Sequence, residues 1–181
     1  MTMNAKPTLE TPRLGLRPYD TSDIAELLPL VGSREVAATT LRIAHPYTEE
    51  HARAFLALAD EPDKIWLAIT LRNDGRQIGG IGLRLEPQHR HAELGYWLGV
   101  QYWGLGYATE AAQEMIRYGF QDLGLHRIFA SHFAHNPASG RILKKLGMRW
   151  EGCQRQHLRK WDQFIDLELY GQLRQEWETR E

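Results

Sequence analysis

A glycine-containing segment between a predicted strand and a predicted helix constrains this chain most. Apolar residues over 108–123 repeat at i, i+3, i+4 and i+7, which predicts an amphipathic helix. The segment before it, Gln101–Gly106 (QYWGLG), follows a strand predicted over 91–100. A helix N-terminus offers unpaired N–H groups and a positive dipole, and glycines remove the Cβ atoms that would block an anion. The segment therefore predicts a pyrophosphate site, with a tight turn that binds nothing as the alternative.

A second copy of the same pattern shows how little it means without context. Gln77–Gly82 (QIGGIG) runs on into the strand pattern of Leu83–Leu85 and opens no helix. We therefore expect its glycines to allow close backbone approach or a bulge. Neither copy fits the dinucleotide fingerprint Gly-x-Gly-x-x-Gly or a P-loop.

Strand and helix signals alternate along the rest of the chain and predict an α/β (α+β) domain. Segment 32–47 has no clear period and is expected to be a loop, and Asn73–Gly75 signals a hairpin. We expect a flexible tail at 1–8 and a single domain at 9–181. Strands are predicted at 13–17, 65–71, 77–85, 91–100, 127–133, 148–158 and 164–173, and helices at 22–31, 48–58, 108–123 and from Asn136-Pro137 to Gly147.

Composition and charge argue against several classes of function. A formal net charge of -1 disfavours a strongly basic nucleic-acid-binding surface. With Cys153 as the single cysteine, and no carboxylate cluster beside His89–His91 or His132–His135, we expect no metal site. No apolar run approaches the ~20 residues that cross a membrane, and Met1–Glu10 lacks a signal-peptide layout. We therefore expect no membrane association and a cytoplasmic location.

The glycine segment and its surroundings resemble a known enzyme family. Ala92–Leu98 followed by Tyr102–Ala111 is similar to the acetyl-CoA motif of the GNAT superfamily, and more narrowly to its Rim-type branch of ribosomal-protein N-terminal acetyltransferases. Thr11–Pro18, Asn136–Ser139 and Leu146–Gly152 agree with this resemblance. It implies the GNAT acyl-CoA N-acyltransferase fold, a mixed and mostly antiparallel sheet of about seven strands with about four helices. It also implies acetyl transfer from acetyl-CoA to a primary amine.

The resemblance assigns cofactor contacts along the chain. It places acetyl-CoA where the strand ending near Val100 splays from the strand beginning near Arg127. Backbone groups of 98–100 are expected to pair with the pantetheine arm, segment 101–108 to surround the pyrophosphate, and Asn136, which also reads as a helix cap, to contact the pantetheine amides. The predicted cofactor-binding residues are Leu98, Gly99, Val100, Gln101, Trp103, Gly104, Leu105, Gly106, Tyr107, Ala108, Thr109, Asn136 and Ser139.

Two side chains are the predicted catalytic groups. Glu93 is the leading candidate for the base, directly or through water, and the alternative is a solvated or ion-paired strand carboxylate. His157 and Glu110 are weaker candidates for that role. The resemblance places Ser139 near the CoA sulfur as a proton donor, with an ordinary first-turn helix residue as the alternative. A backbone N–H at 98–99 is expected to polarise the carbonyl.

The sequence restricts the identity of the amine acceptor less than it restricts the identity of the cofactor. Leu158 stands where some Rim-type enzymes carry a catalytic glutamate, which leaves the base unsettled. At pH 7 an α-amine costs ~1 kcal/mol to deprotonate and a lysine ~4–5 kcal/mol, so a protein N-terminus is favoured. A small-molecule amine (polyamine, antibiotic or amino acid) and a non-catalytic acetyl-CoA sensor stay open. Family layout suggests that Trp66, Trp103 and 42–47 shape the acceptor site, and that the chain forms a homodimer.

Overall fold

The computed structural model describes residues 6–180, and its eight strands form one sheet in the order β1-β2-β3-β4-β5-β6-β8-β7. Neighbouring strands are antiparallel, except that β5 and β6 are parallel. The predicted mixed, mostly antiparallel sheet is therefore confirmed, with one strand more than expected. The strands are β1 (Leu9–Glu10), β2 (Leu14–Pro18), β3 (Lys64–Leu71), β4 (Gln77–Glu86), β5 (His91–Leu98), β6 (Arg127–Phe133), β7 (Arg149–Lys160) and β8 (Gln163–Leu173).

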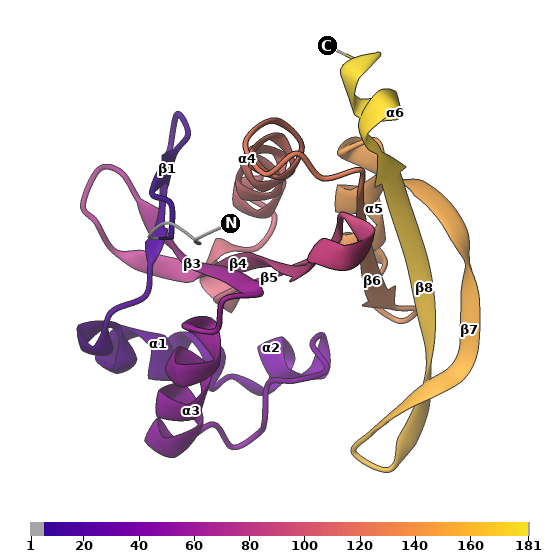
Figure 1. Cartoon of the computed structure of the whole chain (residues 1–181). Coiled ribbons are helices and arrows are strands. Elements are labelled where there is room, and N and C mark those ends of the chain that lie inside the picture. The colour runs from indigo at the N-terminus through magenta and orange to yellow at the C-terminus, as the bar shows by residue number, and fades with distance from the viewer. Residues whose placement is uncertain (1–5, 181) are drawn as a thin grey trace.

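Helices cover both faces of this sheet (Figure 1). Apolar residues of α4 and α5 share the larger core with β2 to β6, whereas α1, α2 and α3 enclose a second cluster around Leu27 and Val36 on the opposite face. This arrangement puts the glycine segment, which precedes α4, on the face opposite to α1–α3. The helices are α1 (Ile24–Val31), α2 (Arg34–Ala38), α3 (Glu49–Ala59), α4 (Tyr107–Gln121), α5 (Pro137–Lys145) and α6 (Arg174–Glu178).

Three short elements depart from the sequence prediction. Segment 32–47, expected to be a loop, contains α2, whose N-cap Ser33 accepts a hydrogen bond from the Val36 N–H. The five residues of α2 are too few to show a helical period, and the same is true of α6. The two residues of β1 are likewise too few to show the alternation of a strand. Residues 1–5 of the predicted flexible tail lie outside the described residues.

The sheet is not continuous along the whole length of β5 and β6. The two strands pair only over His91–Glu93 and Arg127–Phe129, although each continues for four or more residues. Beyond this point β6 pairs with β8 and β5 pairs with β4. The edge of β5 from Leu94 to Leu98 therefore faces a gap between the central strands, which is the predicted splay.

Candidate active site

The loop before α4 has the backbone geometry that an anion-binding site requires. Gly104 and Gly106 have left-handed φ angles of 74° and 84°, which favour glycine, and a Cβ on Gly104 would meet nothing within 4 Å. Gly106 is the N-cap and has no side chain to accept from the first turn. The Glu110 N–H donates to Gly106 O at 3.1 Å, so the N–H groups before it have no intrahelical partner. This open cradle fits the pyrophosphate of CoA.

A brace from the N-terminal segment fixes this loop. Glu110 accepts hydrogen bonds from the Thr11 hydroxyl at 2.6 Å and from the Arg13 backbone N–H at 2.9 Å, and pairs with Arg13 Nε at 2.6 Å. Arg13 also donates to Leu105 O at 3.0 Å and lies 4.5 Å over the Tyr107 ring. Desolvation favours the neutral carboxyl, but the bonds from Thr11 and Arg13 outweigh it, so the pKa of Glu110 lies below its usual value. Both carboxylate oxygens are already hydrogen-bonded, and the lowered pKa makes Glu110 a poorer proton acceptor, so it serves better as a structural anchor than as the base.

Backbone groups of β5 line the gap in an alternating pattern. The Gly99 N–H donates to Ile78 O at 2.9 Å and so points toward β4. Because the direction alternates along an antiparallel strand, the N–H and C=O of Leu98 point into the gap. The indole N–H of Trp103 donates to Leu98 O at 2.8 Å. Of the two candidates for polarising a carbonyl, the Leu98 N–H faces the gap and the Gly99 N–H does not.

Tyr96 and Ser139 meet on the α4 and α5 side of the gap. Their hydroxyl oxygens are 2.7 Å apart, and either group can be the donor. Burial raises the pKa of Tyr96 to about 12, with the Ser139 hydrogen bond acting against this, so the phenol keeps its proton at neutral pH. Asn136 caps α5 by accepting from the Ser139 N–H at 3.4 Å. The cap uses only the side-chain oxygen of Asn136, so the cap and the predicted contact of its NH₂ group with the pantetheine amides are compatible.

Glu93 projects from the opposite face of β5. It lies three residues before Tyr96 in a strand, which places the two side chains on different faces. Glu93 forms an ion pair with Arg84, its direct cross-strand neighbour on β4, and the Glu93 side chain is 27% exposed. It also belongs to the last residue pair between β5 and β6. Glu93 therefore lies where β5 and β6 begin to separate, which we call the apex of the gap. Its side chain is on the α1–α3 face of the sheet, and its carboxylate is already paired with a cation. His157, the other weaker base candidate, is exposed on β7.

Glycines on the Glu93 face make room for aromatic rings. A Cβ on Gly82 would lie 2.5 Å from Trp66 Cε3, and one on Gly95 would lie 3.1 Å from Trp66 Cη2. A Cβ on Gly80 would lie 2.1 Å from the Tyr19 hydroxyl oxygen. The glycines of the second pattern copy thus allow close approach within the sheet, as predicted, and the Trp66 indole lies against Gly82 and Gly95 on the same face of the sheet as Glu93.

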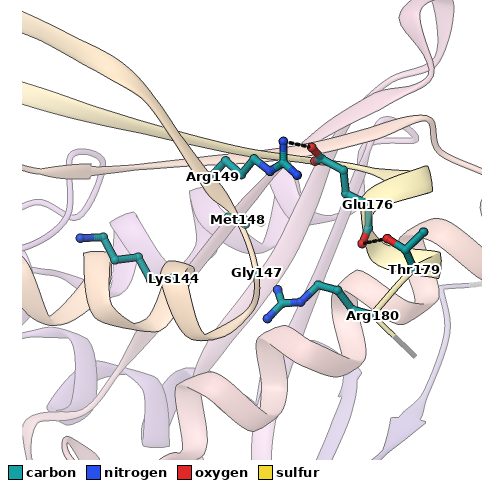
Figure 2. Close-up of a pocket in the computed structure, with 7 residues that line it drawn as sticks. All are labelled: Lys144, Gly147, Met148, Arg149, Glu176, Thr179 and Arg180. Atoms are coloured by element: carbon teal, nitrogen blue, oxygen red, sulfur yellow. Dashed lines mark hydrogen bonds and ion pairs between the residues drawn. The ribbon is translucent and has the colours of Figure 1, made fainter.

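A separate surface cavity lies away from this gap (Figure 2). Its volume is about 440 Å³, and it lies where α5 ends and α6 packs, beyond the helix end opposite to Ser139. Arg149 and Glu176 form an ion pair of 2.9 Å at its wall. None of the predicted site residues lines it. The cavity residues are Lys144, Gly147, Met148, Arg149, Glu176, Thr179 and Arg180.

Three functional candidates were missing from the sequence prediction. Tyr96 lies inside the recognised motif, but its contact with Ser139 joins residues 43 positions apart. Arg84 and Arg13 act through pairs with Glu93 and Glu110 that no local pattern reveals. Among residues 6–180, no three or more His, Cys, Asp or Glu side chains gather as potential metal ligands. No helix described over the same residues is long and apolar enough to cross a membrane.

Comparison with known proteins agrees with the geometry. Residues 13–149 match the acetyltransferase (GNAT) domain family. An uncharacterised N-acetyltransferase of Bacillus subtilis, YoaA, is 35% identical over 91% of this chain and 96% of its own length. The ribosomal-protein-serine acetyltransferase of Escherichia coli is 32% identical over 50% of each chain. The crystal structure of a GNAT-family acetyltransferase from Bacillus anthracis is 25% identical with a TM-score of 0.85, over 93% of this chain and 99% of that one.

The family match covers most of the chain and includes the anion loop, the splayed strands and the start of α5. GNAT enzymes take acetyl-CoA as their acetyl donor, and the cradle before α4 fits its pyrophosphate. The chain belongs to the GNAT family and is an acetyl-CoA-dependent N-acetyltransferase.

Proposed function

We propose that the acceptor is the N-terminal α-amine of a protein, as in the Rim-type branch of the family. The observation that carries this proposal is the position of Glu93, which stands at the apex of the gap and shares its carboxylate with Arg84. An α-amine makes a small demand on such a base, because its pKa is about 8. The 32% identity to a ribosomal-protein-serine acetyltransferase supports the same class of acceptor.

In this proposal, the residues that bind the acetyl donor lie on the α4–α5 face of the sheet, and Glu93, the proposed base, lies on the α1–α3 face. The N–H groups at the start of α4 and the backbone of 98–100 would hold the donor, with Asn136 on its amides. Bound acetyl-CoA supplies a thioester that an amine can attack. The Leu98 N–H would polarise the thioester carbonyl, and Glu93 would take the proton of the attacking amine. Ser139, hydrogen-bonded to Tyr96, would give a proton to the departing thiolate.

Free-thiol release from acetyl-CoA against matched amines tests this proposal. The panel pairs octapeptides that begin with serine, alanine or methionine with the same peptides blocked at the N-terminus, and adds spermidine and an aminoglycoside. We expect release only with the unblocked peptides. Release only with the small amines would contradict the protein acceptor and leave the acetyltransferase activity intact. A homodimer and a cytoplasmic location stay predictions.

A further inference from the structure

Lys160 joins two distant parts of the chain. It is the last residue of β7, and its ammonium donates to the carbonyls of Thr40, of Ile43 at 3.0 Å and of Leu41 at 3.4 Å. These three carbonyls belong to the segment that follows α2, about 120 positions earlier in the sequence. Partial burial lowers the pKa of Lys160, as expected for an ammonium group removed from water.

The hairpin tip next to Lys160 adopts an unfavourable backbone. Trp161 and Asp162 have φ angles of 48° and 62°, in the left-handed region that a two-residue hairpin turn requires and that glycine or asparagine usually fills. The Trp161 ring lies 5.3 Å from the Arg34 guanidinium and 6.2 Å from the His45 ring. A tryptophan in this conformation is retained where surrounding contacts hold it. The hairpin tip therefore contacts both α2 and the loop after it, through the Trp161 ring.

This contact lies on the acceptor side of the gap. Ile43, Tyr47 and Trp97 all pack against the buried cluster on the α1–α3 face of the sheet, and Glu93 projects from β5 on this same face. His135, just after β6, contacts Ala38 O at 3.2 Å. Carbonyls between positions 38 and 43 thus meet side chains from the segment after β6 and from the β7–β8 hairpin, which extends past the level of α2 to the bottom of Figure 1. The loop after α2, which packs on the β5 side of the gap, is therefore linked by these contacts to the β6–β8 side.

We propose that Lys160 is a positioning residue for the amine acceptor, which holds loop 39–47 against the hairpin tip so that the loop forms a fixed wall of the acceptor entrance. This inference rests on the proposed function, because it assumes that an amine enters on the Glu93 face. It assigns no chemical step to Lys160. Its ammonium acts only through the three loop carbonyls.

Limited trypsin digestion of the native protein tests the anchoring without any assay of activity. Arg42 lies in the loop, so its peptide bond reports local opening of that loop. In Lys160→Met we expect cleavage after Arg42 to be about tenfold faster, because charge-assisted hydrogen bonds are lost. Lys160→Arg, which keeps donors and charge, should restore slow cleavage. Arg155→Met is the matched control, because it removes an exposed cation from the same strand that forms no ion pair within residues 6–180.

Steady-state kinetics with the fastest amine of the panel tests the positioning role. For Lys160→Met we expect the KM of the amine to rise about fivefold or more while the KM of acetyl-CoA changes less than about twofold. Unchanged cleavage after Arg42, or equal changes in both KM values, would overturn the inference. A wild-type protein that is silent toward every amine would instead overturn the proposed function, and the acceptor role of Lys160 with it.

Discussion

The hydroxyl oxygens of Tyr96 and Ser139 lie 2.7 Å apart, and they join the splayed part of β5 to the first turn of α5. With its pKa raised to about 12 by burial, Tyr96 retains its proton at pH 7 to about 8. The pair therefore offers a proton on the side of the sheet where the predicted cofactor residues lie. Ser139 is the member that the family resemblance predicts as the proton donor, and we propose that Tyr96 acts through it.

Removing the two hydroxyls in turn distinguishes a proton donor from a packing contact. Ser139→Ala should lower kcat by about 100-fold, the usual scale for losing a general acid. Tyr96→Phe should lower it by about fivefold, the cost of one neutral hydrogen bond. Because Tyr96 acts through Ser139, the double variant should match Ser139→Ala alone. Multiplicative losses in the double variant, measured at saturating acetyl-CoA, would contradict this order of action.

Substitutions at two glycines with the same backbone conformation distinguish an effect on CoA binding from an effect of backbone strain. Gly104 and Gly75 have φ angles of 74° and 73°, and a Cβ on either would meet nothing within 4 Å. Alanine at either position should lower the free energy of unfolding by about 1 kcal/mol, because a residue with a Cβ is disfavoured at a left-handed φ angle. Only Gly104→Ala should weaken CoA binding, by about tenfold or more, because a methyl group enters the anion cradle. Calorimetric titration with CoA and urea unfolding measure the two effects, and equal CoA affinity in both variants would argue against the cradle.

The brace formed by Thr11, Arg13 and Glu110 predicts a pH-dependent stability. A lowered folded-state pKa means that the stabilisation by Glu110 is complete above the ordinary glutamate pKa and is lost as pH falls through the lowered value. Urea unfolding should show wild type more stable than Glu110→Gln by about 2 kcal/mol at pH 7, and the difference should shrink steadily as the pH falls below the ordinary glutamate pKa of about 4.3. Glu50→Gln, at an exposed position in the first turn of α3, serves as the control. A difference that does not change with pH would show that the carboxylate charge is unimportant.

Sequence reasoning located those elements whose signals are local. The predicted strand 127–133 and the start of α5 at Asn136-Pro137 agree with the structure because periodicity and capping chemistry both mark them. The two copies of the glycine pattern were also separated correctly, since only one opens a helix. Helix α2 was missed because a single serine cap is its main signal.

Contacts between distant residues could not be read in the same way. Trp66 lies against Gly82 and Gly95 only because three strands place them in one row across the sheet. Likewise, the ion pair of Glu93 with Arg84 depends on the register of β4 and β5. Sequence alone left open whether Glu93 is a base or an ion-pair partner, and the structure shows that the ion pair exists without excluding the catalytic role.

Glu93 and Arg84 can be tested as a pair to decide this point. If Glu93 is the base, Glu93→Gln should lower kcat/KM for the amine by about 100-fold at pH 7. Part of this loss should be recovered as pH rises toward about 8, where more of an α-amine is already neutral. Affinity for CoA should stay unchanged, because Glu93 projects away from the face that carries Tyr96 and Ser139. Arg84→Met, which leaves the carboxylate in place, should retain most of the activity.

The double variant gives the decisive comparison. If Glu93 served only to balance Arg84, Glu93→Gln would leave an unmatched cation, and removing Arg84 as well would restore activity. If Glu93 takes the proton of the amine, Arg84→Met combined with Glu93→Gln should be as inactive as Glu93→Gln alone, since the loss of Arg84 supplies no new proton acceptor. Thiol release at pH 7 from the two single variants and the double variant, each with unchanged CoA affinity, separates these outcomes.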